Sequence, residues 1–155
     1  YLRNGTMFTD LEGYREEKFY REHPSIRFDT LEEIGTYQII AVFRTVVYSD
    51  GPEAFPYYEY IDMTQEEYNT FLEEIDKRSY FNTTVDVQYG DEFITLSTCE
   101  TLTSEKPTPY RMVVVARKVR PGESYAVDTS SATANTDMIM PEVWVEQNGK
   151  ANPYA

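Results

Sequence analysis

The sequence has one cysteine and one histidine, and these two shortages exclude several kinds of site. A disulfide within the chain needs two cysteines, so Cys99 cannot form one. Cys99 and His23 together also fall short of the four ligands that a structural zinc site takes from Cys and His. The sequence therefore predicts no metal site, and nothing in its chemistry calls for another cofactor.

Long apolar runs and basic residues are also scarce. No run approaches the roughly 20 apolar residues that cross a bilayer, and no signal peptide opens the chain. Lys and Arg number 14 against 27 Asp and Glu, for a net charge of −13, which disfavours binding to nucleic acid or anionic membranes. The acidic stretch 50–76 is interpreted as a solvated face, with a surface for cationic partners as the alternative; it contains no regular calcium loop.

Aromatic residues are plentiful, at 15% of the chain, and the length of 155 residues suits one folded domain. Helices are predicted over 8–22 and 64–77. Thr9 with Glu12 near the start of the first, and Thr64 with Glu67 at the start of the second, have the spacing of a capping box. In the second helix, Tyr68, Phe71 and Ile75 follow the spacing of a core-facing side.

Strands dominate the rest of the pattern. They are predicted over 36–48, over 83–99 with a break at Gly90-Asp91, and over 110–119, because β-branched and aromatic residues are frequent there. The fold class is therefore mostly β, a barrel or sandwich with helical insertions. Residues 121–155 are read as a linker or a surface strap, with one short strand in "MPEVWVEQNGK", residues 140–150.

Cys99 ends one of these strands. Strand alternation places it on the same face as Thr95 and Ser97, beside a loop. A reactive thiol there competes with the plainer interpretation of a small buried hydrophobe. Arg111 opens the next strand, and an antiparallel arrangement would bring it back toward Cys99. Its guanidinium would then stabilise a thiolate, or an oxyanion formed when the thiol attacks a carbonyl.

The stretch "TLSTCE", followed by "RMVVVARKV", closely resembles the signature of the sortases, the cysteine transpeptidases of Gram-positive bacteria. The segment "GTMFTDLEGYREEKFYREHPSI", the helix 64–77 and Ser97 resemble class B in particular. The resemblance runs from about residue 4 to 120. It implies a sortase-type closed β-barrel over 1–120, incomplete at its N-terminus, with 121–155 as a C-terminal extension.

The resemblance also implies roles for individual residues. Cys99 would attack the carbonyl carbon of a Thr in the sorting signal of a surface protein and form a thioester, and Arg111 would orient the substrate and stabilise the oxyanion. The amine of a peptidoglycan precursor or of a pilin lysine would then resolve the thioester. The residues expected beside the bound peptide are Ser97, Glu100, Tyr57 and Tyr58. The alternative function is an inactive sortase-like module that binds peptide or cell-wall material.

The family's catalytic histidine lies in a Gly-His-Asn-like motif shortly before the segment that matches "NGTMF". His23 follows that segment, beside Pro24, and is interpreted as the end of a helix, far from Cys99. We therefore expect this chain to be a fragment without the catalytic His and the N-terminal membrane anchor. The whole protein would then act at the extracellular face of the cell membrane.

Overall fold

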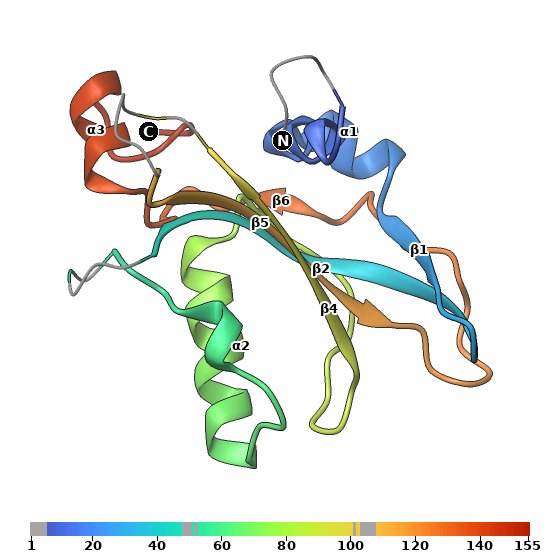
Figure 1. Cartoon of the computed structure of the whole chain (residues 1–155). Helices are drawn as coiled ribbons and strands as arrows, with labels where there is room; N and C mark the ends of the chain where they lie inside the picture. Colours follow the sequence, from blue (N-terminus) through green and yellow to red (C-terminus); the bar gives the residue numbers. More distant parts are fainter. Residues whose placement is uncertain (1–5, 48–50, 52, 101, 103–107) are drawn as a thin grey trace.

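One antiparallel sheet of four strands carries the fold of the computed structural model, which describes residues 6–47, 51, 53–100, 102 and 108–155. Its strands, in spatial order, are β1 (Ser25–Asp29), β2 (Ile34–Val46), β5 (Tyr110–Lys118) and β4 (Phe93–Cys99). Figure 1 shows that the sheet curls into half of a barrel. The described residues are thus mostly β with few helices, as predicted.

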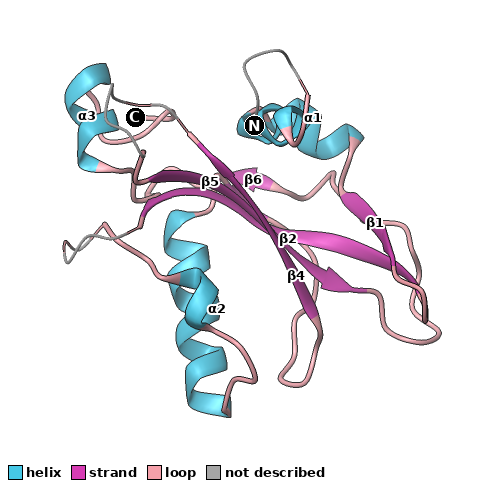
Figure 2. Ribbon diagram, in the orientation of Figure 1, coloured by secondary structure: helices cyan, strands magenta, loops and turns pink. Residues whose placement is uncertain are grey.

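The two faces of the sheet bury separate cores. One face packs against the 3₁₀ helix η1 (Thr9–Arg15), the helix α1 (Glu17–Glu22) and part of the C-terminal segment. The opposite face packs against α2 (Gln65–Arg78) and the 3₁₀ helix η2 (Tyr57–Glu59). Figure 2 shows α1 and α2 on opposite sides of the strands. β2 and β5 are buried along most of their length because both of their faces are covered.

α2 forms where the sequence predicts it. The Thr64 side chain accepts from the Glu67 N–H and the Glu67 carboxylate accepts from the Thr64 N–H, so the capping box is confirmed. Tyr68, Phe71 and Ile75 are buried against the sheet, and each such side chain contributes about 1.5–3 kcal/mol of hydrophobic free energy.

The helix predicted over 8–22 is divided into η1 and α1 at Glu16, whose backbone is extended. The capping box expected at its start is absent, because the Thr9 hydroxyl donates instead to the Thr6 carbonyl at 2.9 Å. Gly13 permits the close fold between the two pieces, since a Cβ at this position would lie 2.9 Å from the Phe19 ring.

Of the two strands predicted over 83–99, only the second, β4, is present. Residues 83–92 lie outside any strand; the Thr83 and Thr84 hydroxyls donate to the Ile40 and Asp128 carbonyls, at 3.2 and 2.7 Å. The short strand β3 (Phe81–Asn82) lies just before them and pairs with β6 (Thr133–Ala134).

The strand predicted over 140–150 is wrong, because this segment forms the helix α3 (Glu142–Asn148). Pro141 precedes the first turn, and Gly149 closes the last turn with a φ of 66°, which glycine adopts without strain. Trp144 is buried in the same cluster as Leu11 and Tyr14 of η1. Within the ranges that the structure describes, no helix is long and apolar enough to cross a membrane.

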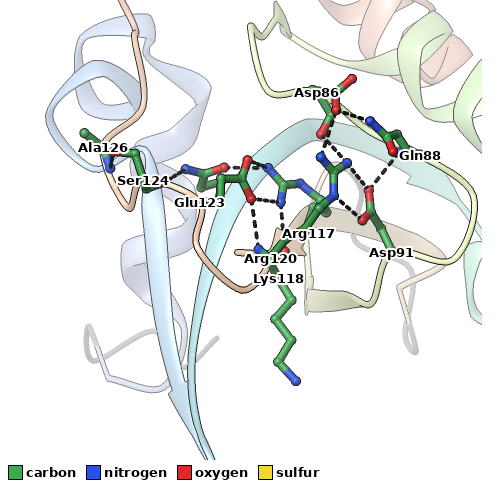
Figure 3. A network of polar contacts seen from close by, with 10 residues as sticks. Asp86, Gln88, Asp91, Arg117, Lys118, Arg120, Glu123, Ser124 and Ala126 are labelled. Atoms are coloured by element: carbon green, nitrogen blue, oxygen red, sulfur yellow. Dashed lines mark hydrogen bonds and ion pairs between the residues drawn. The ribbon is translucent and has the colours of Figure 1, made fainter.

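Polar contacts fix the start of the C-terminal segment to the sheet (Figure 3). The Arg117 guanidinium, which is fully buried, donates to both carboxylate oxygens of Glu123, at 2.5 and 2.6 Å, and to the Gln38 side chain at 2.7 Å. Arg120 forms a second two-pronged pair with Asp91, at 2.7 Å for each contact. These charge-assisted hydrogen bonds therefore fix the direction in which the C-terminal segment leaves β5.

Candidate active site

The register of β4 and β5 brings Cys99 and Arg111 together. The two residues are directly opposite partners, and Thr45 of β2 lies opposite Arg111 on its other side. Direct partners on antiparallel strands have Cα atoms about 4.5–5.5 Å apart and side chains on the same face of the sheet. Cys99 is exposed. The thiol and the guanidinium therefore share one face at the end of both strands, as the sequence predicts.

Two carbonyls hold the Arg111 guanidinium from one side. Its Nη1 donates to the carbonyls of Thr108 and Tyr110, at 2.6 and 2.8 Å. Among the residues with a described position, the Arg111 Nε and Nη2 groups donate to none. The planar guanidinium is thus anchored through one nitrogen, which leaves its other donors for a carbonyl or an oxyanion.

Tyrosines border the same face of β4. The Tyr57 hydroxyl lies 2.6 Å from the Ser97 hydroxyl, and Ser97 is two residues before Cys99 on the same side of the strand. The Tyr58 ring meets the Tyr57 ring edge-on at 5.4 Å and is 46% exposed. Ser97, Tyr57 and Tyr58 therefore form a wall beside the thiol that combines an apolar surface with hydroxyl groups.

Glu100 lies on the other face of the sheet. Consecutive strand residues alternate, so its side chain turns away from the thiol and toward η1. There the Glu100 carboxylate pairs with the Arg44 guanidinium, and the Arg15 guanidinium lies 4.0 Å from the same carboxylate. Burial raises the pKa of the Glu100 carboxyl, and the Arg44 charge opposes that rise. Glu100 is only 4% exposed, so this arrangement offers no direct contact with a peptide, contrary to the sequence prediction.

His23 follows the last residue of α1 at the far side of the sheet. The N–H of Ile39 donates to the carbonyl of Pro24 at 2.9 Å, whereas Cys99 lies level with Thr45. Six residues of β2 therefore separate the two levels, about 20 Å along the strand. β1 and β4 are also the opposite edges of the four-stranded sheet. The predicted separation of His23 from the thiol is thus confirmed.

Two supporting residues were missed from the sequence. The Thr108 hydroxyl donates to the Glu100 carbonyl at 2.6 Å, and the Thr108 carbonyl accepts from Arg111. Thr108 therefore links the end of β4 to Arg111. Arg44 is the buried partner of Glu100. Arg44 lies within the apolar run 36–48, and a charged residue in such a run indicates a buried partner. The sequence pattern did not identify Glu100 as that partner.

Within the parts of the chain that have described positions, no group of three or more His, Cys, Asp or Glu residues could hold a metal ion. The chemistry available at this site is that of a thiol, a guanidinium and hydroxyl groups. A thiol on the same face as a fixed cation suits nucleophilic attack on a carbonyl.

Comparison with known proteins identifies similar chains, although no family model matches. A sortase B of Staphylococcus aureus (strain NCTC 8325 / PS 47) is 33% identical over 122 residues, which cover 77% of this chain and 46% of that protein. The chain thus spans less than half the length of this curated relative.

Solved structures show the same likeness. The S. aureus sortase B–substrate complex matches with a TM-score of 0.60 and 30% identity over 77% of this chain and 51% of that chain. A sortase B complexed with triglycine matches with a TM-score of 0.64 and 31% identity over 77% and 52%. Together, the shared sequence and the shared fold place this chain among the class B sortases.

Proposed function

We propose that this protein is a cysteine transpeptidase in which Cys99 is the nucleophile. The observation that carries the proposal is the register pair of Cys99 and Arg111 at the exposed end of β4 and β5. A cation held beside a thiol favours the thiolate, which is the form that attacks carbonyl carbon. The similar S. aureus protein has been solved as a substrate complex, which supports a peptide as the ligand of this fold.

The reaction has two stages. The Cys99 sulfur bonds to the carbonyl carbon of a Thr in the sorting signal, and the carbonyl oxygen becomes an oxyanion. The oxyanion then collapses, the peptide C–N bond breaks, the leaving amine takes a proton, and a thioester remains. An amine from a peptidoglycan precursor or a pilin attacks the same carbon, forms the new amide and releases the thiol.

Arg111 stabilises the oxyanion in both stages. Its Nη1 is fixed by two backbone carbonyls, so the remaining N–H donors hold their direction without reorganising during the reaction. The wall formed by Ser97, Tyr57 and Tyr58 lies along the same face and would contact the peptide before the Thr. A motif of the Asn-Pro type that ends in Thr-Asn or Thr-Gly is the proposed sorting signal.

The thiol proton needs an acceptor, and His23 lies about 20 Å away along the strand direction. We propose that a histidine outside these residues, in the family's Gly-His-Asn-like motif, receives it. The same proposal places the whole protein at the extracellular face of the membrane, held by an N-terminal anchor. A protein without such a histidine would instead be a peptide-binding module.

The test combines the full-length gene product with a sorting-signal peptide and triglycine, and it measures the ligated product by chromatography with mass detection. A product that joins the Thr carbonyl to triglycine is expected from the wild type, and none from Cys99→Ser. Binding of the peptide by both proteins without any product would identify the non-catalytic module instead.

A further inference from the structure

We infer that the C-terminal helix α3 is a positioning element for the Cys99–Arg111 pair, so that the extension is part of the active site's framework. This inference rests on the proposed function. The resemblance to sortases ends at about residue 120, so the family motif assigns no role to the extension 121–155.

α3 is tied to the segments that leave the sheet at the site. At its start, the Glu142 N–H donates to the Glu53 carboxylate at 2.5 Å. Glu53 lies just past the end of β2, where its own carbonyl accepts from the Thr45 hydroxyl at 3.4 Å. Because Thr45 is the strand partner of Arg111, this contact links the start of α3 to the strand beside Arg111.

The other end of α3 contacts the segment that follows Cys99. The Gln147 Nε2 donates to the Leu102 carbonyl at 2.7 Å. The Leu102 side chain also packs against the buried cluster that contains Trp144 of α3. Leu102 is three residues after the thiol in the sequence, so this contact lies close in the chain to the end of β4. Figure 1 shows α3 at the end of the sheet where β2 ends and β5 begins.

α3 itself is held firmly enough to transmit this constraint. Met138 and Met140, just before the helix, are buried in the same cluster as Trp144, at 3%, 5% and 8% exposed. The Asn135 side chain donates to the carbonyls of Asp76 and Ser79 at 2.9 Å each, which joins the strap to the end of α2. The helix is therefore packed into the cluster on the η1 face of the sheet, and it is hydrogen-bonded near its two ends to Glu53 and Leu102.

The geometric demand on such a pair is high, since a misplacement of about 1 Å between reacting groups can lower a rate about 100-fold. The Gln147 contact is a single exposed hydrogen bond, for which a loss of about three- to tenfold in rate is expected. A brace of this kind acts on the approach of the thiol to the carbonyl carbon, and less on peptide binding.

The experiment compares Gln147→Ala and Gln147→Glu with the wild type in the full-length protein. The Gln147→Glu change keeps nearly the same side-chain shape but removes the amide donor. Glu146→Gln is the matched control, since Glu146 is exposed on the same helix and its replacement also alters one charge. The measurements are the rate of acyl-adduct formation with the sorting-signal peptide, the rate of Cys99 alkylation by iodoacetamide against pH, and the free energy of unfolding in urea.

Both Gln147 variants should form the adduct about three- to tenfold more slowly and should show slower alkylation of Cys99, because the end of β4 is no longer held beside Arg111. The Glu146→Gln control should change neither the rate of adduct formation nor the rate of Cys99 alkylation. Unaltered rates and profiles in the Gln147 variants would overturn the inference, as would an equal loss in the control or losses that only follow unfolding. If the wild type forms no adduct but the Gln147 variants are still alkylated more slowly than the wild type, the proposed function is refuted while the brace is supported.

Discussion

The ion pair between Arg117 and Glu123 should carry a large part of the stability that joins the C-terminal segment to the sheet. The Arg117 side chain is 0% exposed and the Glu123 side chain 28%, and two hydrogen bonds of 2.5 and 2.6 Å join them. Replacement of Glu123 by Gln leaves the guanidinium buried without a counter-charge. Breaking such a pair costs about 3–5 kcal/mol, and the partial exposure of Glu123 reduces this to about 2–4 kcal/mol.

The pH dependence of this pair has a defined sign. Arg117 holds the pKa of Glu123 at about 2, below the ordinary value of 4.5. A depressed pKa in the folded state gives stability that is present above about pH 4.5 and is lost as the pH falls toward 2. Wild-type stability should therefore decline over this window, and Glu123→Gln should show a flatter decline because its side chain does not titrate.

Urea unfolding, followed by circular dichroism at neutral pH and across that acidic window, measures both effects. Glu92→Gln is the control, since Glu92 is 68% exposed and its partner Lys118 also contacts Glu33. The control should lose at most about 1 kcal/mol. If the free energy of unfolding of Glu123→Gln lies within about 0.5 kcal/mol of the wild-type value at neutral pH, the view that this buried pair anchors the segment is refuted.

Three further predictions concern the site. Arg111→Lys should lower the rate of transpeptidation by about 10²- to 10³-fold while peptide binding changes little, because Lys keeps the charge but loses the planar donors; steady-state kinetics and calorimetric binding check this. His23→Ala should keep most activity and lose about 1 kcal/mol or less in urea unfolding; loss of activity without unfolding would contradict its placement. Tyr57→Phe should lower the free energy of unfolding by about 1 kcal/mol, and adding Ser97→Ala should cost little more, because both remove the same hydrogen bond. Additive losses in that double variant would contradict the shared contact.

Local patterns predicted the elements that form their own boundaries. The capping box of α2 and the apolar spacing of Tyr68, Phe71 and Ile75 placed that helix within a residue of its observed limits, 65–78 against a predicted 64–77. The strand that carries Arg111 was predicted over 110–119 and is observed over Tyr110–Lys118. In both segments, propensity and burial pattern favour the same structure.

The misses arise where tertiary contacts decide. Val143 and Val145 favoured a strand over 140–150, but the burial of Trp144 and the turn at Gly149 fix a helix there. Glu100 was read beside the peptide because it follows Cys99 in the family motif. Strand alternation instead turns it to the opposite face, where Arg44 supplies a partner that is remote in the sequence.

The most direct test of the account is the identity of the covalent intermediate. The full-length protein is mixed with a sorting-signal peptide without any amine acceptor, quenched in acid, and measured as an intact protein and as tryptic peptides by mass spectrometry. The account predicts an added mass equal to the peptide up to its Thr, joined to Cys99 in the wild type and absent from Cys99→Ala. An adduct that persists in Cys99→Ala, or that maps to another residue, would contradict it.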